Sequence, residues 1–69
     1  MHVSARNVLK GRVKKINVGS VNTEVIIDVG GAEIVSIITK SSATELKLEV
    51  GSEAYAVIKA SNVMLGVDH

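Results

Sequence analysis

The stretch that decides the fold is residues 21–39, which read VNTEVIIDVGGAEIVSIIT. Apolar or β-branched side chains occupy every second position from Val21 to Val29. Such period-two alternation is typical of a half-buried strand. Gly30-Gly31 follows at once, and a Gly-Gly pair between two apolar runs indicates a tight β-hairpin. The second strand of this hairpin is expected from Ala32 to Thr39.

The second strand of the hairpin is apolar on both of its faces. Ile34 and Ile38 share one parity, while Val35 and Ile37 share the other. A strand with two apolar faces must be covered on both. One small domain has a single interior, so we expect the second face to meet another subunit.

A longer strand is expected before the hairpin, from Asn7 to Val18, with a turn at Gly19-Ser20. Its apolar positions change parity at Lys14-Lys15, which indicates a β-bulge or a sharp bend. The positions concerned are Leu9 and Val13 before the change, and Ile16 and Val18 after it.

After the hairpin, the pattern predicts a short helix and two more strands. Residues 42–45, SATE, have capping-box spacing, with Ser42 as N-cap and Glu45 at N3; the helix should run to about Leu48 and end before Gly51. The strands are expected at Glu53–Ala60 and about Val63–Val67. Three strands, a helix and two strands is the order of an all-β, five-stranded OB-like barrel.

Size and composition narrow the possibilities. A chain of 69 residues forms one domain, and it buries too little surface to be comfortable alone. It has no Cys, and its two imidazoles, His2 and His69, are at the termini, so oligomerisation is the remaining way to stabilise it. A net charge of +1 gives no broad attraction to nucleic acid or membrane, and no apolar run approaches a membrane span of about 20 residues. The lack of Cys suits the cytoplasm.

Three short islands concentrate hydrogen-bond donors: Ser4-Ala5-Arg6-Asn7, Thr39-Lys40-Ser41-Ser42 and Lys59-Ala60-Ser61. None of them supplies a nucleophile with a base, or a cluster of metal ligands. A small ionised oxyanion offers only lone pairs, so its site needs N–H and O–H donors with positive charge. The islands fit that requirement.

Each of these residues also has a simpler interpretation. Arg6 could be a surface residue paired with Glu45 or Glu49, and Lys59 could point outward by ordinary alternation. Ser42 could be only a helix cap. Ser4 and Thr39 could satisfy nearby backbone groups, as short hydroxyl side chains often do. The residues alone leave these alternatives open.

The islands, in this order and spacing, resemble the molbindins, the small molybdate-binding proteins. Ser4-Ala5-Arg6-Asn7 followed by Leu9-Lys10-Gly11 is similar to the opening signature of that family. Ser36-Ile37-Ile38-Thr39 leading to Ser42, and Val57-Ile58-Lys59-Ala60 leading to Val63-Met64, resemble its later segments. The resemblance covers nearly the whole chain, and it implies that residues 1–69 form a single domain of this family.

The resemblance implies an OB-like barrel in a hexamer, built as a trimer of dimers, with oxyanion sites between subunits. Ser4, Ala5 and Arg6 would line one side, and Lys59, Ala60 and Ser61 would lie nearby. Thr39 and Ser42 would approach from a neighbouring chain. A second site, on the threefold axis, is assigned to the turn Val18-Gly19-Ser20-Val21. The ligand would be molybdate, with tungstate as a substitute.

The leading hypothesis is therefore a cytoplasmic molybdate-binding protein for storage or homeostasis. The alternatives are an OB-fold nucleic-acid-binding protein and a regulatory interaction module. Nucleic-acid-binding OB folds stack bases on aromatic side chains, and Tyr55 is the one aromatic residue here. An enzyme is not expected, because the sequence shows no activated nucleophile or tuned acid–base pair.

Overall fold

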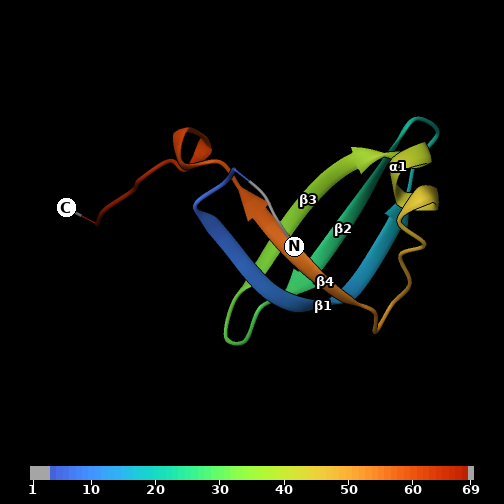
Figure 1. The fold of residues 1–69 in the computed structure, drawn as a ribbon, viewed down its shortest axis with the longest axis horizontal. Coiled ribbons are helices and arrows are strands. Elements are labelled where there is room, and N and C mark those ends of the chain that lie inside the picture. Colours follow the sequence, from blue (N-terminus) through green and yellow to red (C-terminus); the bar gives the residue numbers. More distant parts are fainter. Residues whose placement is uncertain (1–3, 69) are drawn as a thin grey trace.

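The computed structural model describes residues 4–68, which form one antiparallel sheet with the strand order β3-β2-β1-β4. The elements are β1 (Asn7–Val18), β2 (Asn22–Asp28), β3 (Glu33–Thr39), helix α1 (Lys40–Glu45), β4 (Glu53–Ile58) and the short 3-10 helix η1 (Ala60–Asn62). The sheet curls into a half-barrel with α1 at one end, while the C-terminal segment leads away from the other end (Figure 1). No helix within residues 4–68 is both long and apolar enough to cross a membrane.

The curl of the sheet is concentrated in β1. The register of β1 against β2 shifts between Val13 and Lys15, which confirms the predicted bulge. Gly11 lies just before it and pairs with Ala54 of β4. A Cβ atom on Gly11 would lie 2.3 Å from the carbonyl oxygen of Asp28, so only glycine allows this close approach.

The core lies on the concave face of the sheet. Its buried apolar residues are Val13, Val25, Ile27 and Ala56, with Ile34 and Ile38 packed against them. The alternation predicted for the hairpin is therefore confirmed. On the opposite face of β3, Val35 is 59% exposed and Ile37 is 67% exposed, so residues 4–68 leave the second apolar face of this strand largely uncovered.

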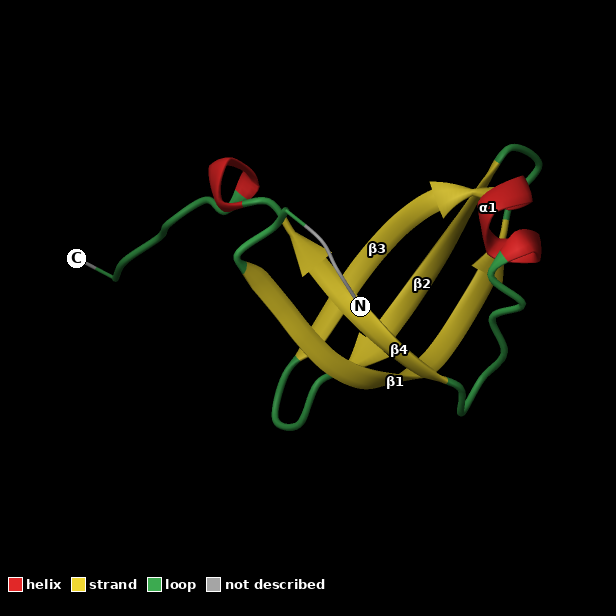
Figure 2. Ribbon diagram, viewed as in Figure 1, coloured by secondary structure: helices red, strands yellow, loops and turns green. Residues whose placement is uncertain are grey.

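The predicted fifth strand is wrong. Residues 63–68 have no strand partner among the described residues and run away from the sheet (Figure 2). The cause is η1: β4 ends at Ile58, rather than at the predicted Ala60, and the turn of η1 redirects the chain before a further strand can pair. An apolar strand without a hydrogen-bonding neighbour has nothing to hold it in a sheet. Met64 and Leu65 are accordingly 92% and 94% exposed.

The predicted helix exists, but its boundaries are shifted toward the N-terminus. Thr39 is the N-cap, with an extended backbone at ψ 153°, and its side chain accepts a hydrogen bond from the backbone N–H of Ser42. Ser42 is thus the third helical residue and not the cap. The helix ends at Glu45 rather than near Leu48, because the chain turns at Lys47 into a left-handed conformation (φ 54°). Such a residue cannot continue a right-handed helix.

Candidate functional site

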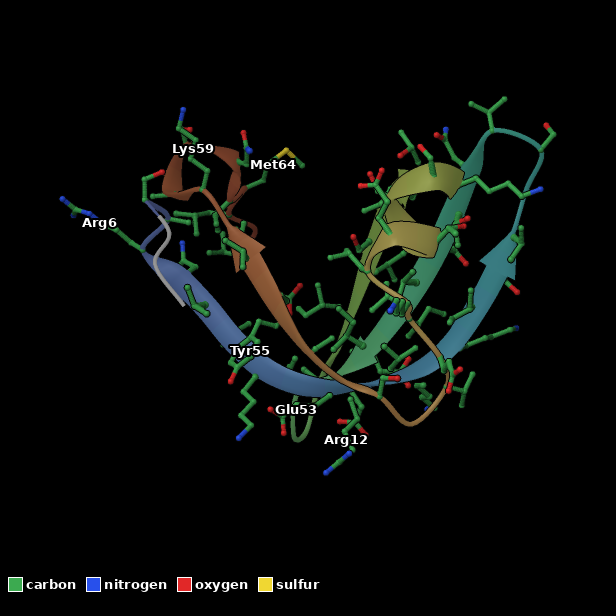
Figure 3. The ribbon with its side chains drawn as sticks, turned by 45° about the vertical axis from the view of Figure 1, so that its right-hand side comes forward. Arg6, Arg12, Glu53, Tyr55, Lys59 and Met64 are labelled. Carbon is green, nitrogen blue, oxygen red and sulfur yellow. The ribbon has the colours of Figure 1, made fainter. Side chains whose placement is uncertain are left out.

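Two of the predicted donor islands meet where β1 begins and β4 ends. The register pairs Asn7 with Ile58, so Arg6 and Lys59 each stand one residue beyond the last pair of these strands. Both side chains are exposed and extend from the same end of the ribbon (Figure 3). The strand pairing therefore places the two cationic residues at one end of the ribbon, although their side chains point in different directions (Figure 3).

Most basic side chains on β1 already have partners. The ammonium group of Lys10 lies 3.5 Å from a carboxylate oxygen of Glu53, and Lys14 pairs with Glu33. Arg12 donates from Nη1 to the carbonyl oxygen of Gly51 at 3.0 Å. Arg6 and Lys59, by contrast, have no ion-pair partner within residues 4–68. The predicted pair of Arg6 with Glu45 or Glu49 is therefore absent from residues 4–68, while Arg6 is a surface residue as the simpler interpretation states.

The neighbours of Arg6 and Lys59 surround this pair with small groups. Ser4 is exposed and Ala5 is half-buried, just before β1 begins. Ala60 and Ser61 belong to η1, whose first turn closes with a 2.8 Å hydrogen bond from the backbone N–H of Asn62 to the carbonyl oxygen of Lys59. Six predicted site residues thus lie around one end of the β1–β4 ribbon; we call this the cationic end.

Thr39 and Ser42 lie elsewhere, where β3 passes into α1. The hydroxyl of Thr39 donates to Oγ of Ser42 at 2.8 Å and accepts from the backbone N–H of Ser42 at 3.1 Å. Oγ of Ser41 is 3.4 Å from Oγ1 of Thr39. The proton of Thr39 is committed in this arrangement, so Ser42, which accepts it, keeps its own hydroxyl proton for another acceptor. We call this group the hydroxyl end.

The turn predicted as a second site lies beside the hydroxyl end. In the turn Val18-Gly19-Ser20-Val21, the backbone N–H of Gly19 donates to the carbonyl oxygen of Asn22 at 2.8 Å. The backbone N–H of Lys40 donates to the carbonyl oxygen of Val21, also at 2.8 Å. An open hollow of about 650 Å³ lies between turn and helix, lined by Ser20, Val21, Lys40, Ser41, Thr44 and Glu45.

One chain does not unite the two ends. The cationic end is at the start of β1, and the hydroxyl end is near its last residue, because β3 ends beside Asn22 and β2 starts opposite Val18. A strand rises about 3.3 Å per residue, so the path along β1 is roughly 35–40 Å. Because the sheet is curled (Figure 1), the straight distance between the two ends is shorter than this path, and the two ends are separate groups of residues in one chain.

The chemistry available at the two ends is the donation of hydrogen bonds to an anion. An arginine offers five N–H donors and a lysine three, and neither offers an acceptor. Within residues 4–68, no three His, Cys, Asp or Glu side chains gather as a metal-ion site would require. Sequence reasoning placed Asn7 in a donor island but gave it no role; its Nδ2 donates to the carbonyl oxygen of Ile58 at 3.2 Å.

Comparison with known proteins connects this geometry to a family. Residues 3–65 match the model of the TOBE domain. A probable molybdenum-pterin-binding protein of Haemophilus influenzae is 54% identical over 69 residues, which cover 99% of this chain and 100% of that protein.

Solved structures agree with the sequence match. A molybdate-binding protein from Sporomusa ovata superposes with a TM-score of 0.91 at 34% identity, over 97% of this chain and 100% of the other. The cytoplasmic molybdate-binding protein ModG, with molybdate bound, superposes with a TM-score of 0.92 at 52% identity. That match covers 99% of this chain and 49% of the ModG chain.

Proposed function

The chain belongs to the TOBE domain family, as its resemblance to molbindins predicted, and on that premise we propose that it binds molybdate reversibly, as a cytoplasmic store or buffer of this oxyanion. The observation that carries the proposal is the position of Arg6 and Lys59, each one residue beyond the last register pair of β1 and β4 and without a carboxylate partner in the described chain. Molybdate carries two negative charges, and these residues supply two positive ones. The whole chain, residues 1–69, acts in this proposal as one domain.

The binding mechanism uses hydrogen bonds and charge, with no covalent step. Arg6 presents a planar fork that can hold two oxygens at once, and Lys59 adds a second ammonium charge. The hydroxyl of Ser42 donates from a neighbouring copy, and Ser4, Ala5, Ala60 and Ser61 frame the anion with small side chains and backbone. A site made of donors disfavours phosphate, which carries its own proton near neutral pH. Tungstate has the same charge and shape as molybdate and should bind in its place.

Assembly is part of the proposal, because the cationic and hydroxyl ends lie at opposite ends of β1 in one chain and would meet between copies. Two exposed apolar surfaces support it: the outer face of β3, with Val35 and Ile37, and the C-terminal segment, with Met64 and Leu65. Large apolar surfaces on a small protein commonly mark subunit contacts. We propose a hexamer arranged as a trimer of dimers, with a further oxyanion site at the turn from Val18 to Val21.

The proposal is tested by titrating the purified protein with molybdate, tungstate, sulfate and phosphate in a calorimeter, after sedimentation has established its mass. Molybdate and tungstate should bind, and sulfate and phosphate should bind much more weakly. A ligand at a hundredfold excess over its dissociation constant stabilises the folded state by about 2.7 kcal/mol, so thermal melts provide a second measurement. Equal melting shifts with sulfate and molybdate, or a species of only 7.2 kDa, would contradict the proposal.

A further inference from the structure

Asn7 joins the two strands that carry Arg6 and Lys59. Its side-chain Nδ2 donates to the carbonyl oxygen of Ile58 at 3.2 Å, in a partly buried contact between residues 51 positions apart. Asn7 and Ile58 are also the last register pair of β1 and β4. The contact therefore lies directly before the cationic residue on each strand.

The peptide geometry makes this contact relevant to Lys59. The carbonyl of Ile58 and the backbone nitrogen of Lys59 belong to one planar peptide unit. A hydrogen bond to that oxygen restrains the orientation of the peptide plane between Ile58 and Lys59. The next peptide is restrained from the other side, since the carbonyl of Lys59 accepts the backbone N–H of Asn62 at 2.8 Å. The peptide units before and after Lys59 are thus both restrained by hydrogen bonds.

Arg6 is restrained through the same residue. It is bonded covalently to Asn7, whose backbone is paired in the sheet and whose side chain is anchored on β4. One of the two side-chain amide protons of Asn7 is directed at the carbonyl oxygen of Ile58. Asn7 therefore acts on the two cationic residues and has no need to touch the anion.

We propose that Asn7 is a positioning residue of the oxyanion site, which fixes the placement of Arg6 relative to Lys59. This inference rests on the proposed function. Two cationic groups that are already placed lose less conformational freedom when the anion binds, so affinity is higher than for the same groups on loosely joined strands.

The test is a double-mutant cycle between Asn7 and Arg6, measured as sodium molybdate affinity by calorimetry on the assembled protein. Asn7→Leu removes the donor at similar size and should weaken binding about tenfold, the effect of one good hydrogen bond. In the Arg6→Ala background the same change should cost little more, because the geometry that Asn7 controls no longer matters. Such non-additivity separates positioning from a general loss of stability.

The matched control is Asn17→Leu, near the other end of the same strand. The Asn17 side chain also donates a hydrogen bond, at 2.8 Å to a carboxylate oxygen of Glu24, but it lies outside the proposed site. This variant should leave molybdate affinity at the cationic end unchanged in both backgrounds. Asn17 directly precedes the turn from Val18 to Val21, so binding at that turn is fitted as a separate site. Asn7→Ser, which keeps a hydroxyl too short to span the contact, is the second variant if Asn7→Leu does not assemble.

Each outcome is decisive. If Asn7→Leu binds like the unaltered protein while Arg6→Ala binds weakly, the inference is wrong and the proposed function stands. If Asn7→Leu loses the same factor in both backgrounds, or if neither Asn7 variant assembles, Asn7 supports the fold and not the site. If the unaltered protein binds no molybdate, the proposed function fails and the inference fails with it.

Discussion

The two ends of the sheet differ in how their hydrogen-bond donors are used. At the cationic end, Arg6 and Lys59 carry charge that the described chain does not compensate. At the hydroxyl end, Thr39 and Ser42 form two hydrogen bonds with one another, and the one from the backbone N–H of Ser42 caps α1. The charges at the cationic end are left for an anion to compensate, while the hydrogen bonds at the hydroxyl end form within the chain. We therefore expect the cationic end to supply most of the binding energy and the hydroxyl end to add direction and selectivity.

The largest effect is expected from Arg6→Ala. A charge-assisted hydrogen bond contributes about 1.5–3 kcal/mol, so losing two should weaken molybdate binding about a hundredfold or more. The melting temperature of the ligand-free protein should change little, because Arg6 is exposed and precedes β1. Calorimetry and thermal melts measure the two quantities separately.

Arg6→Lys tests whether the planar guanidinium group of Arg6 is needed in addition to its charge. It keeps the charge but cannot hold two oxygens in one plane, so it should recover only part of the affinity. Sites at the turn from Val18 to Val21 should survive both changes, leaving a fraction of the bound anion. An unaltered isotherm for Arg6→Ala would mean that the cationic end is not the site.

Ser42→Ala should have a smaller effect, about tenfold on affinity, since it removes one neutral donor. Thr39 remains the N-cap and can still accept the backbone N–H of residue 42, so α1 should persist. The measurement is the same titration, combined with far-UV circular dichroism. A loss as large as that of Arg6→Ala would remove the distinction between the two ends.

Thr39→Val should lower stability more than affinity, the opposite of what is expected for Arg6→Ala. Loss of an N-cap hydroxyl costs about 1 kcal/mol, which lowers the melting temperature by roughly 4–8 °C in a chain of this size. Affinity should fall less than in Arg6→Ala, because Ser42 keeps its hydroxyl. Thr39→Ser retains the cap and should melt near the unaltered protein. A Thr39→Val protein of unchanged stability would show that the cap is not needed.

Local patterns predicted most of the sheet. The bulge in β1 is visible as a change of parity, and the hairpin is visible as alternation around two glycines, because period-two burial leaves a direct trace in the residue order. The cap of α1 was misplaced because both Thr39 and Ser42 are good capping residues, and the choice between them depends on where β3 ends. The fifth strand failed for a different reason: its apolar pattern is real, but η1 turns the chain away from the sheet after β4 ends at Ile58.

The site was predictable in its residue types and less so in its arrangement. Donor-rich islands indicate an anion from chemistry alone, whereas the register that brings Arg6 beside Lys59 is a property of the whole fold. The role of Asn7 was not visible, since its partner is the backbone of Ile58 and backbone carries no sequence signature.

Lys14→Gln should have the smallest effect and gives the sharpest contrast with the cationic end. Lys14 is a cation that already has a carboxylate partner, Glu33, and both side chains are exposed, so water and salt screen the pair. Removing it should leave molybdate affinity unchanged. Lys15→Gln, the neighbouring change, is the control for lowering net charge by the same amount. A clear loss of affinity in both variants would show that overall charge, and not placement, governs binding.

The pair of Lys14 and Glu33 should also make the stability of the protein depend on pH in a defined direction. The hydrogen bond to Glu33, with its charge and that of Asp28, raises the pKa of Lys14 above its ordinary range against a small opposing effect of burial. A raised pKa means that the folded state holds the proton more tightly than the unfolded state. The pair's small contribution to stability is therefore complete below the ordinary lysine pKa and disappears as pH rises through the raised one. Melts of the unaltered protein and Lys14→Gln should differ slightly at neutral pH and converge in strong alkali, while at neutral pH added salt should reduce the same difference.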